Sequence, residues 1–403
     1  MRRGLAALAV VLSAAVAAAG TARSSSPTAL STRLARALAV PHVAASRSAA
    51  VAFDLETGTA VFSRNDALAL APASNEKLTV TYAALAGLGA DYRIETDVLG
   101  QGEQLGATWR GSVVLQGHGD PTLSSGDLVW LARQVRGAGI RRIVGSVVGD
   151  ESYFDSRRTA PGWKRSFYIN ESPPLSALTV DRTWFHTHHS GAPALAAAAL
   201  FRDALRKAGV AVTGPARVGR AAEDALPLGR VLSPPLGLIV RFMDRESDNF
   251  TAELLLKQLG AASGVVGSSY SGAVQAREIL ATTGVPVAGV RIVDGSGLSA
   301  DDRLTARAIV GILRAAWTDP TVRGPFVAAL AVSGRSGTLR DRLRRPPAAG
   351  VVQAKTGTTA IASALSGFVR RRYVFSVLQN GHPVSSWWAR RAQDRFVTVL
   401  AAQ

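Results

Sequence analysis

A break in the residue pattern between about positions 95 and 230 most constrains what this chain can fold into. Before the break, residues 51–62 alternate apolar and polar side chains around a glycine-containing turn, which predicts a β-hairpin, and a helix is expected to start near Ser74. Inside the break, short β-like runs alternate with glycine-rich turns, followed by one helical stretch at 194–208. The helices expected after it lie at residues 236–242, 251–259 and 271–283. The return to a helical pattern predicts a separate β-rich domain inserted at 95–230.

The C-terminal part adds strands and a last helix. The strands are expected at residues 351–355, 364–369 and 373–378. From residue 386 to 401, apolar side chains recur every four positions, which predicts a helix with one face packed in the core. The main domain is therefore expected to consist of residues 27–94 and 231–403, on either side of the insertion.

The N-terminus has the pattern of an export signal. Two arginines at positions 2 and 3 precede an apolar run of about 15 residues, and small residues follow it. The run is short for a membrane span, which needs about 20 apolar residues. Residues 1–26 are expected to be a cleaved signal peptide and a linker, so that the protein works outside the cytoplasm. An uncleaved anchor is the alternative.

Composition excludes several functions. The chain contains no cysteine, which excludes a thiol nucleophile, a disulfide framework and a thiolate metal site. Its 46 Lys and Arg outnumber 29 Asp and Glu, for a formal charge of +17, but no basic motif interleaved with aromatic residues predicts nucleic-acid binding. The charge reflects either a solvated surface or attraction to an anionic cell-wall polymer. The histidines at 186–189 crowd into one segment without metal-ligand spacing, which favours a surface loop.

Three short polar motifs could carry chemistry, and the first is Ser74-Asn75-Glu76-Lys77. Positions three apart share one face of a helix, so the Ser74 hydroxyl and the Lys77 amine can meet. A serine needs a base to become a nucleophile, and a lysine kept neutral by desolvation can serve. Only five lysines occur in the chain, and arginine cannot lose its proton near neutral pH. A helix cap followed by a solvated lysine is the plainer interpretation.

The second and third motifs lie much further along the chain. Ser247-Asp248-Asn249 stands before an expected helix, where it offers a hydroxyl relay and an amide, or simply a helix N-cap. Lys355-Thr356-Gly357-Thr358 ends an apolar strand, where a cation beside hydroxyls would suit a carboxylate and the glycine would admit a ligand close to the backbone. An ordinary strand-to-turn junction is the alternative. On a strand, Lys355 and Gly357 would share one face and the two threonines the other.

The three motifs in this order, together with the insertion, resemble the low-molecular-mass class C penicillin-binding proteins, the D-alanyl-D-alanine carboxypeptidase/endopeptidase family. Further stretches similar to that family lie at 117–123, 233–236, 294–299 and 337–339. The resemblance covers the chain from about residue 30 to the end. It implies an α/β (α+β) fold: a serine β-lactamase/DD-peptidase-like domain with an antiparallel sheet flanked by helices, plus the inserted β-rich domain.

Carried over by motif, the resemblance also implies roles for individual residues. Ser74 would attack the carbonyl between two D-alanines and form an acyl-enzyme, and Lys77 would take its proton. Ser247 would relay a proton to the leaving amine. The residues implied to bind the substrate are Asn249, Lys355, Thr356, Gly357 and Thr358. Backbone N–H groups of Ser74 and Thr358 would form the oxyanion hole, and neither a metal nor a cofactor is implied.

Peptidoglycan stem peptides are the implied substrates, and β-lactams are the implied covalent inhibitors. Two other functions stay open: a β-lactamase or D-amino-acid esterase on the same scaffold, and a wall-binding protein that no longer catalyses. The long insertion argues against a compact β-lactamase, and the intact motifs argue against lost catalysis. The glycine-rich segment Asp294-Gly295-Ser296-Gly297 lacks the context of a dinucleotide site, so a turn at the rim of a cleft is expected.

Overall fold

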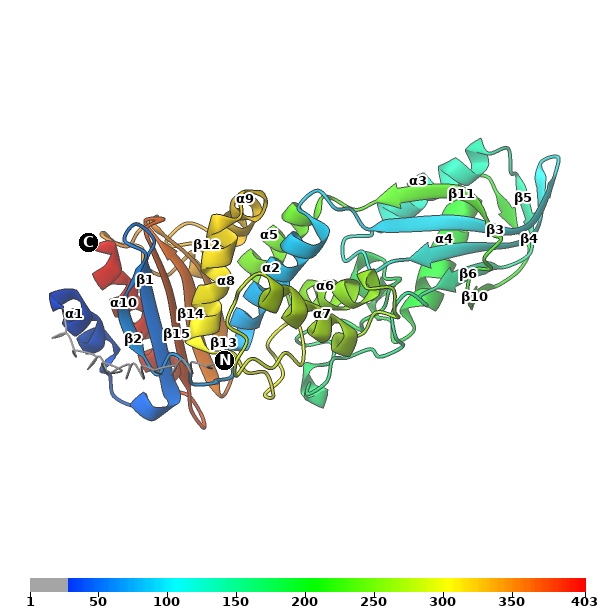
Figure 1. Ribbon diagram of the computed structural model, residues 1–403. Helices are drawn as coiled ribbons and strands as arrows, with labels where there is room; N and C mark the ends of the chain where they lie inside the picture. The colour runs from blue at the N-terminus through cyan, green and yellow to red at the C-terminus, as the bar shows by residue number, and fades with distance from the viewer. Residues whose placement is uncertain (1–27) are drawn as a thin grey trace, which may run out of the picture.

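The computed structural model describes residues 28–403 and shows an elongated molecule with a sheet towards each end and helices between them (Figure 1). The expected signal peptide at 1–26 lies outside the described residues. Within residues 28–403, no helix combines the length and the apolar character that crossing a bilayer requires.

A six-stranded antiparallel sheet forms the base of the larger domain, in the order β12-β13-β14-β15-β1-β2. Its strands are β1 (Ser48–Asp54), β2 (Thr59–Arg64), β12 (Ala331–Val332), β13 (Val352–Thr358), β14 (Ala362–Val369) and β15 (Tyr373–Asn380). The predicted hairpin is confirmed as β1 and β2, and β1 pairs with β15 so that Ser48 lies opposite Gln379. Segments from both ends of the described chain therefore complete one sheet.

Helices cover both faces of this sheet (Figure 1). On one face, α1 (Ala29–Leu38) packs against α10 (Ser386–Ala401), which confirms the predicted C-terminal helix. The helices on the side of the other face are α2 (Glu76–Leu88), α5 (Leu236–Glu246), α6 (Asn249–Ala262), α7 (Ser269–Thr282), α8 (Ala306–Thr318) and α9 (Pro320–Ala329). A separate apolar core fills each face, with Phe375 and Phe396 in the first and Leu255 and Phe368 in the second. Because both faces of the sheet are covered, β14 and β15 are buried along almost their whole length.

The segment between α2 and α5 forms a second sheet with its own core. Its strands are β3 (Glu95–Leu105), β4 (Thr108–Gly117), β5 (Arg142–Val144), β6 (Val147–Asp150), β9 (Ala211–Val212), β10 (Ala216–Val218) and β11 (Leu226–Leu232). Two helices pack on it, α3 (Ser125–Gly137) and α4 (Pro193–Lys207), and a small hairpin joins β7 (Trp184–Phe185) to β8 (His188–His189). Because β11 pairs with β3, the chain enters and leaves this unit on neighbouring strands. Strand β11 ends at Leu232, two residues after the end expected for the insertion at 230.

Candidate active site

The first and third motifs lie against each other, where the end of β13 meets the turn that leads into α2. The Asn75 side-chain amide donates to the Lys355 carbonyl oxygen at 3.0 Å. A Cβ atom on Gly357 would lie 2.9 Å from the Pro72 carbonyl oxygen and 3.1 Å from the Ser74 nitrogen. Any side chain at position 357 would therefore push the strand away from Ser74, so the glycine is needed for this close approach.

Ser74 lies in a short 3₁₀ turn (Ala73–Asn75) at the start of α2, and Lys77 follows it by one turn. Ser74 is half-buried, whereas Lys77 is completely buried. The Lys77 amine lies 3.1 Å from the Ser74 hydroxyl oxygen, 2.8 Å from Asn249 Oδ1 and 2.7 Å from the Ser296 carbonyl oxygen. The last two atoms can only accept hydrogen bonds, so a neutral amine spends both of its N–H groups on them. Its lone pair is then left for the Ser74 hydroxyl.

Burial shifts Lys77 towards that neutral form. Burial lowers the pKa of Lys77 to about 8, although the carboxylates of Asp294, Asp248 and Asp244 oppose the shift. Burial and the nearby Asp294 raise the pKa of Glu76, the residue before Lys77, well above its usual range. Glu76 therefore does not supply the full negative charge that would hold a proton on Lys77.

Ser247 ends α5 in the left-handed conformation, with φ 58° and ψ 40°. Its hydroxyl accepts a hydrogen bond from the Lys355 amine at 2.9 Å. The neighbouring Asp248, and not Ser247, is the N-cap of α6, since its carboxylate accepts from the Thr251 nitrogen. Arg182 of the inserted unit pairs with Asp248 through both guanidinium nitrogens, at 3.2 and 2.7 Å. The capping role thus falls to the neighbour, and the Ser247 hydroxyl is left to face Lys355.

Asn249 begins α6 and links the two parts of the molecule. Its side-chain oxygen accepts from Lys77, and its amide nitrogen donates to the Glu171 carbonyl oxygen at 3.0 Å. The family resemblance implies that this residue binds the peptide backbone of the substrate. In the structure the amide holds Lys77 and the inserted unit together, and its second N–H, which lies 3.5 Å from a Glu171 carboxylate oxygen, is the one that a substrate could take.

Lys355 is completely buried beside Ser247, and its pKa is lowered to about 7 by burial and by the neighbouring Lys77, against the attraction of Asp244. The two threonine hydroxyls further along β13 have other partners. The Thr356 hydroxyl lies 2.8 Å from that of Thr338, and the exposed Thr358 hydroxyl accepts from Arg390 at 3.3 Å. The structure therefore brings Ser74, Lys77, Ser247, Asn249 and Lys355 into contact, while both threonine hydroxyls lie outside this contact network.

Several residues at the site were not anticipated from the sequence. The segment expected at a cleft rim lies against Lys77, because the Ser296 carbonyl accepts from that amine. Asp294 holds this segment in place: its carboxylate accepts from Gly297 N–H at 2.8 Å and from the indole N–H of Trp163 at 2.5 Å. A buried acid followed by two glycines is a readable turn signal, but nothing local indicates which lysine the turn will meet.

The histidine-rich segment lies in the β7–β8 hairpin, where His189 Nδ1 contacts the Arg182 carbonyl oxygen. Among residues 28–403, no group of three or more His, Asp or Glu side chains is arranged to hold a metal ion.

A family model described as the D-Ala-D-Ala carboxypeptidase 3 (S13) family matches residues 30–191 and 186–403. The chain belongs to this family. Among curated relatives, a D-alanyl-D-alanine carboxypeptidase of Actinomadura sp. is 31% identical over 83% of this chain and 78% of its own length. The carboxypeptidase DacB of Mycolicibacterium smegmatis is 34% identical over 92% of this chain and 83% of its own length.

Solved structures show the same fold. Penicillin-binding protein 4 of Haemophilus influenzae superposes with a TM-score of 0.79 over 92% of this chain and 98% of its own, at 21% identity. The same protein with a β-lactam superposes with a TM-score of 0.74 and 20% identity, at the same coverage. The predicted DD-peptidase-like fold is thereby confirmed, as is the predicted class of enzyme, a serine-type D-Ala-D-Ala carboxypeptidase of this family.

Proposed function

We propose that this chain cleaves the bond between two D-alanines in peptidoglycan stem peptides, as a carboxypeptidase and endopeptidase, through an acyl-enzyme on Ser74. The observation that carries the proposal is the environment of the Lys77 amine. The amine is completely buried, it donates to two carbonyl-type oxygens, and its nitrogen lies 3.1 Å from the Ser74 hydroxyl oxygen. Such an amine can accept the serine proton as the hydroxyl oxygen attacks a carbonyl carbon.

The edge of β13 would hold the substrate. Thr359 N–H donates to Ala362 of the neighbouring strand, so by the alternation of the ladder the Thr358 N–H points to the opposite edge, on the side of Ser74. Together with the Ser74 N–H, it would stabilise the oxyanion of the tetrahedral intermediate, at roughly 3 kcal/mol for each donor. The terminal carboxylate of the peptide would bind beside Lys355 and the hydroxyls of Thr356 and Thr358.

Binding of that carboxylate would also set the charges of the two lysines. In the free site Lys355 and Lys77 have lowered pKa values of about 7 and about 8, so their titrations overlap. An anion beside Lys355 raises its pKa and keeps a proton there, which favours the neutral form of Lys77. Ser247, hydrogen-bonded to Lys355, would then pass a proton to the leaving amine. Water finally releases the acyl group.

The proposal is tested by incubating the protein with a stem pentapeptide and measuring D-alanine release, and by labelling it with a fluorescent penicillin followed by peptide mapping. We expect D-alanine release and a long-lived adduct on the peptide that contains Ser74. Rapid turnover of the penicillin would point to a β-lactamase instead. If neither an adduct nor D-alanine release is detected, the protein would instead be a non-catalytic wall-binding protein. An adduct mapped to another peptide would refute the site.

The pH profile of the reaction follows from the two lysines. We expect a bell-shaped kcat/KM with its maximum between about 7 and about 8, because activity requires the pair to hold a single proton. Below this range Lys77 is protonated and cannot act as the base, and above it Lys355 loses the charge that attracts the carboxylate. Measurement of D-alanine release from pH 5.5 to 9.5 checks this. A profile that stays flat through this range contradicts the assignment.

Removal of the Ser247 hydroxyl should slow the reaction without unfolding the protein. We expect Ser247→Ala and Ser247→Gly both to lower kcat by about 10²-fold or more, the range of a lost proton relay. The glycine variant separates chemistry from backbone strain, since glycine adopts the φ of 58° at this position without cost. A serine also stands two positions before an asparagine in Ser63-Arg64-Asn65, at the end of β2 and away from the site. Ser63 is exposed, so Ser63→Ala serves as the matched control and should retain full activity. Recovery of activity in the glycine variant would assign the effect to the backbone.

We also propose that the protein works outside the cytoplasm, where peptidoglycan lies. The family matched by the chain and the export signal expected at 1–26 support this location. Detection of the mature N-terminus in a wall or culture fraction would test it.

A further inference from the structure

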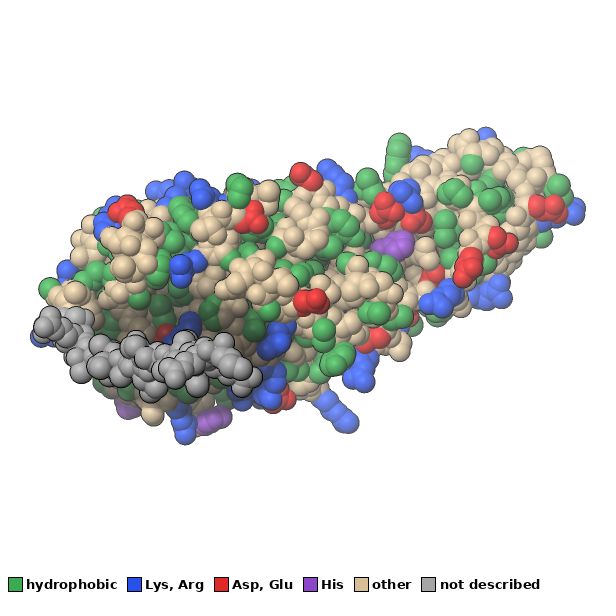
Figure 2. Space-filling model, viewed as in Figure 1, with side chains coloured by type: hydrophobic (Ala, Val, Ile, Leu, Met, Phe, Trp, Pro, Cys, Tyr) green, Lys and Arg blue, Asp and Glu red, His purple; other side chains and the backbone are tan. Residues whose placement is uncertain are grey.

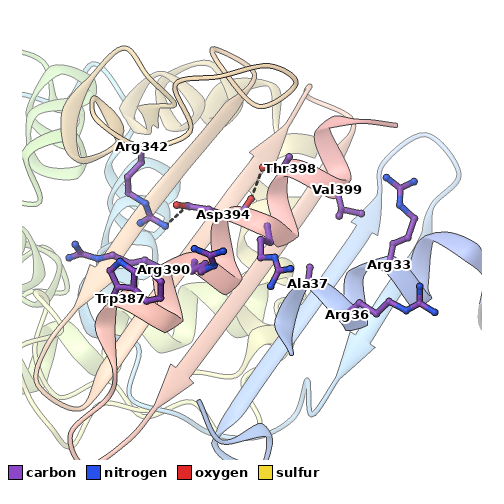
Figure 3. Close-up of a pocket in the computed structure, with 11 residues that line it drawn as sticks. Arg33, Arg36, Ala37, Arg342, Trp387, Arg390, Asp394, Thr398 and Val399 are labelled. Carbon is purple, nitrogen blue, oxygen red and sulfur yellow. Dashed lines mark hydrogen bonds and ion pairs between the residues drawn. The ribbon is translucent and has the colours of Figure 1, made fainter. Parts of the chain in front are cut away.

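We propose that a groove between α1 and α10 binds a linear phosphodiester polyanion, the chemistry of anionic cell-wall polymers. The groove has a volume of about 820 Å³ and lies on the face of the main sheet opposite to α2 (Figure 3). Its binding can be measured without turnover, so the inference does not rest on the proposed function.

The charge of the groove is strongly one-sided. Its arginines are Arg33, Arg36, Arg342, Arg390, Arg391 and Arg395. They come from α1, from α10 and from the segment that carries Arg342 (Figure 3). The one acidic residue lining the groove, Asp394, is already paired with Arg342 at 2.6 Å. Five exposed guanidinium groups therefore repel one another around a shared hollow, an arrangement that an anionic ligand would stabilise.

Most of these guanidinium groups are available to a ligand. Within residues 28–403, Arg33, Arg36 and Arg395 form neither an ion pair nor a side-chain hydrogen bond. Arg391 lies over the rings of Trp387 and Trp388, with its Cζ atom 5.3 and 5.9 Å from the ring centroids. This contact fixes the side chain but leaves its N–H groups free to bind phosphate oxygens.

The geometry favours a linear chain over a membrane surface. Along α10 the lining positions run from Trp387 to Val399, on one face of the helix, which corresponds to about 18 Å at 1.5 Å per residue. Arg33 and Arg36 on α1 line the other side, so cations lie on both sides of a trough whose apolar lining residues are Ala37, Trp387 and Val399. A bilayer presents its headgroups in a plane and would meet protruding side chains, whereas a trough encloses a strand with charges at regular intervals. Planar guanidinium groups match phosphate oxygens in pairs.

The wider surface does not repeat this arrangement on the face that Figure 2 shows. There, lysine and arginine side chains are spread along the whole molecule and interrupted by acidic ones. The net charge of +17 thus attracts polyanions to the whole surface, and the groove would be their specific binding site.

The test uses a fluorescent glycerol-phosphate octamer as the probe and compares two double variants of equal charge. Arg391→Gln/Arg395→Gln removes two groove cations, and Arg133→Gln/Arg277→Gln removes two exposed cations from α3 and α7. We expect the groove variant to weaken binding at least about tenfold at 0.1 M salt. The number of counterions released on binding, measured from the salt dependence of the binding constant, should fall by about two. The control should stay within about twofold of the unmodified protein. Arg390 is left unchanged because its guanidinium group contacts Thr358.

A second pair, Arg33→Gln/Arg36→Gln on the opposite wall, keeps the test valid if α10 tolerates substitution poorly, and thermal unfolding checks the fold of each variant. Equal weakening by groove and control variants would show a general charge effect and overturn the proposal. Vesicles of anionic phospholipid provide the other arm: tighter groove-dependent binding to vesicles than to the octamer would assign the groove to a membrane surface instead. An octamer that does not bind at 0.1 M salt also overturns it.

Discussion

The Ser74→Ala variant is expected to lose penicillin labelling completely and to release D-alanine at least about 10⁴-fold more slowly than the unmodified protein. The hydroxyl oxygen is the atom that forms the acyl bond, and alanine has no nucleophilic atom in its place. The fold should persist, because Ser74 is half-buried and its hydroxyl bonds only to Lys77 among the described residues. Labelling intensity, D-alanine release and thermal unfolding check the three parts of this expectation.

A cysteine at the same position supplies a further control. Ser74→Cys would carry the single thiol of the protein, so its alkylation rate can be followed without background. A thiol 3 Å or so from a buried amine should form the thiolate more easily than a free cysteine, whose pKa is about 8.5. Alkylation at the rate of an unperturbed thiol would contradict the contact between this position and Lys77. Residual D-alanine release by Ser74→Ala would dismiss Ser74 as the nucleophile.

Lys77→Arg is the second substitution expected to have a large effect, although it keeps the charge. We expect kcat for D-alanine release to fall by about 10³-fold or more, because a guanidinium group does not give up its proton and cannot act as a base. Arginine is also larger, and Lys77 is completely buried, with its amine bonded to Asn249 and Ser296. Acylation by penicillin, measured as a single-turnover rate, isolates this step from product release.

The matched control is Lys257→Arg, at another fully buried lysine. Its amine pairs with Asp155 at 2.5 Å, an interaction that arginine can also make, so acylation per folded molecule should change little. If Lys257→Arg slows acylation as much as Lys77→Arg does, the loss comes from packing and not from the missing base. Comparable thermal unfolding with very different acylation rates would support the assignment of Lys77.

Much of the local structure was readable from the sequence, and the failures have physical causes. The hairpin at 51–62 and the final helix were predicted because alternation and a four-residue repeat report burial directly. Helix α3 was not anticipated, although Ser124 and Asp127 form a capping box and Leu128, Leu131, Ala132 and Val135 form a buried stripe. The glycine-rich turns that flank residues 125–137 favour strands, which is why the sequence predicts a β-rich segment at the position of this helix. The unit is a mixed sheet carrying two helices.

The site shows the same division between local and distant contacts. Ser74 and Lys77 are three residues apart, and helical spacing alone predicts that they meet. Three other contacts of the two lysines are long-range. Lys355 and Ser247 are 108 positions apart, and Lys77 is 172 positions from Asn249 and 219 from Ser296. Residue types at those positions indicate possible partners, but only the packing of α2, α6 and β13 around a common core selects them.

By itself, the sequence determined the residue types of the site, their order along the chain, the one pairing that lies within a helical turn, and the family resemblance that the comparisons confirmed. Only the tertiary structure decided that Asn249 bonds to Lys77 and Glu171, that a glycine-rich segment meets Lys77, and that arginines of α1 and α10 line one groove. The reason is that backbone geometry dictates contacts over a few residues, whereas contacts over a hundred or more depend on which apolar surfaces are buried together.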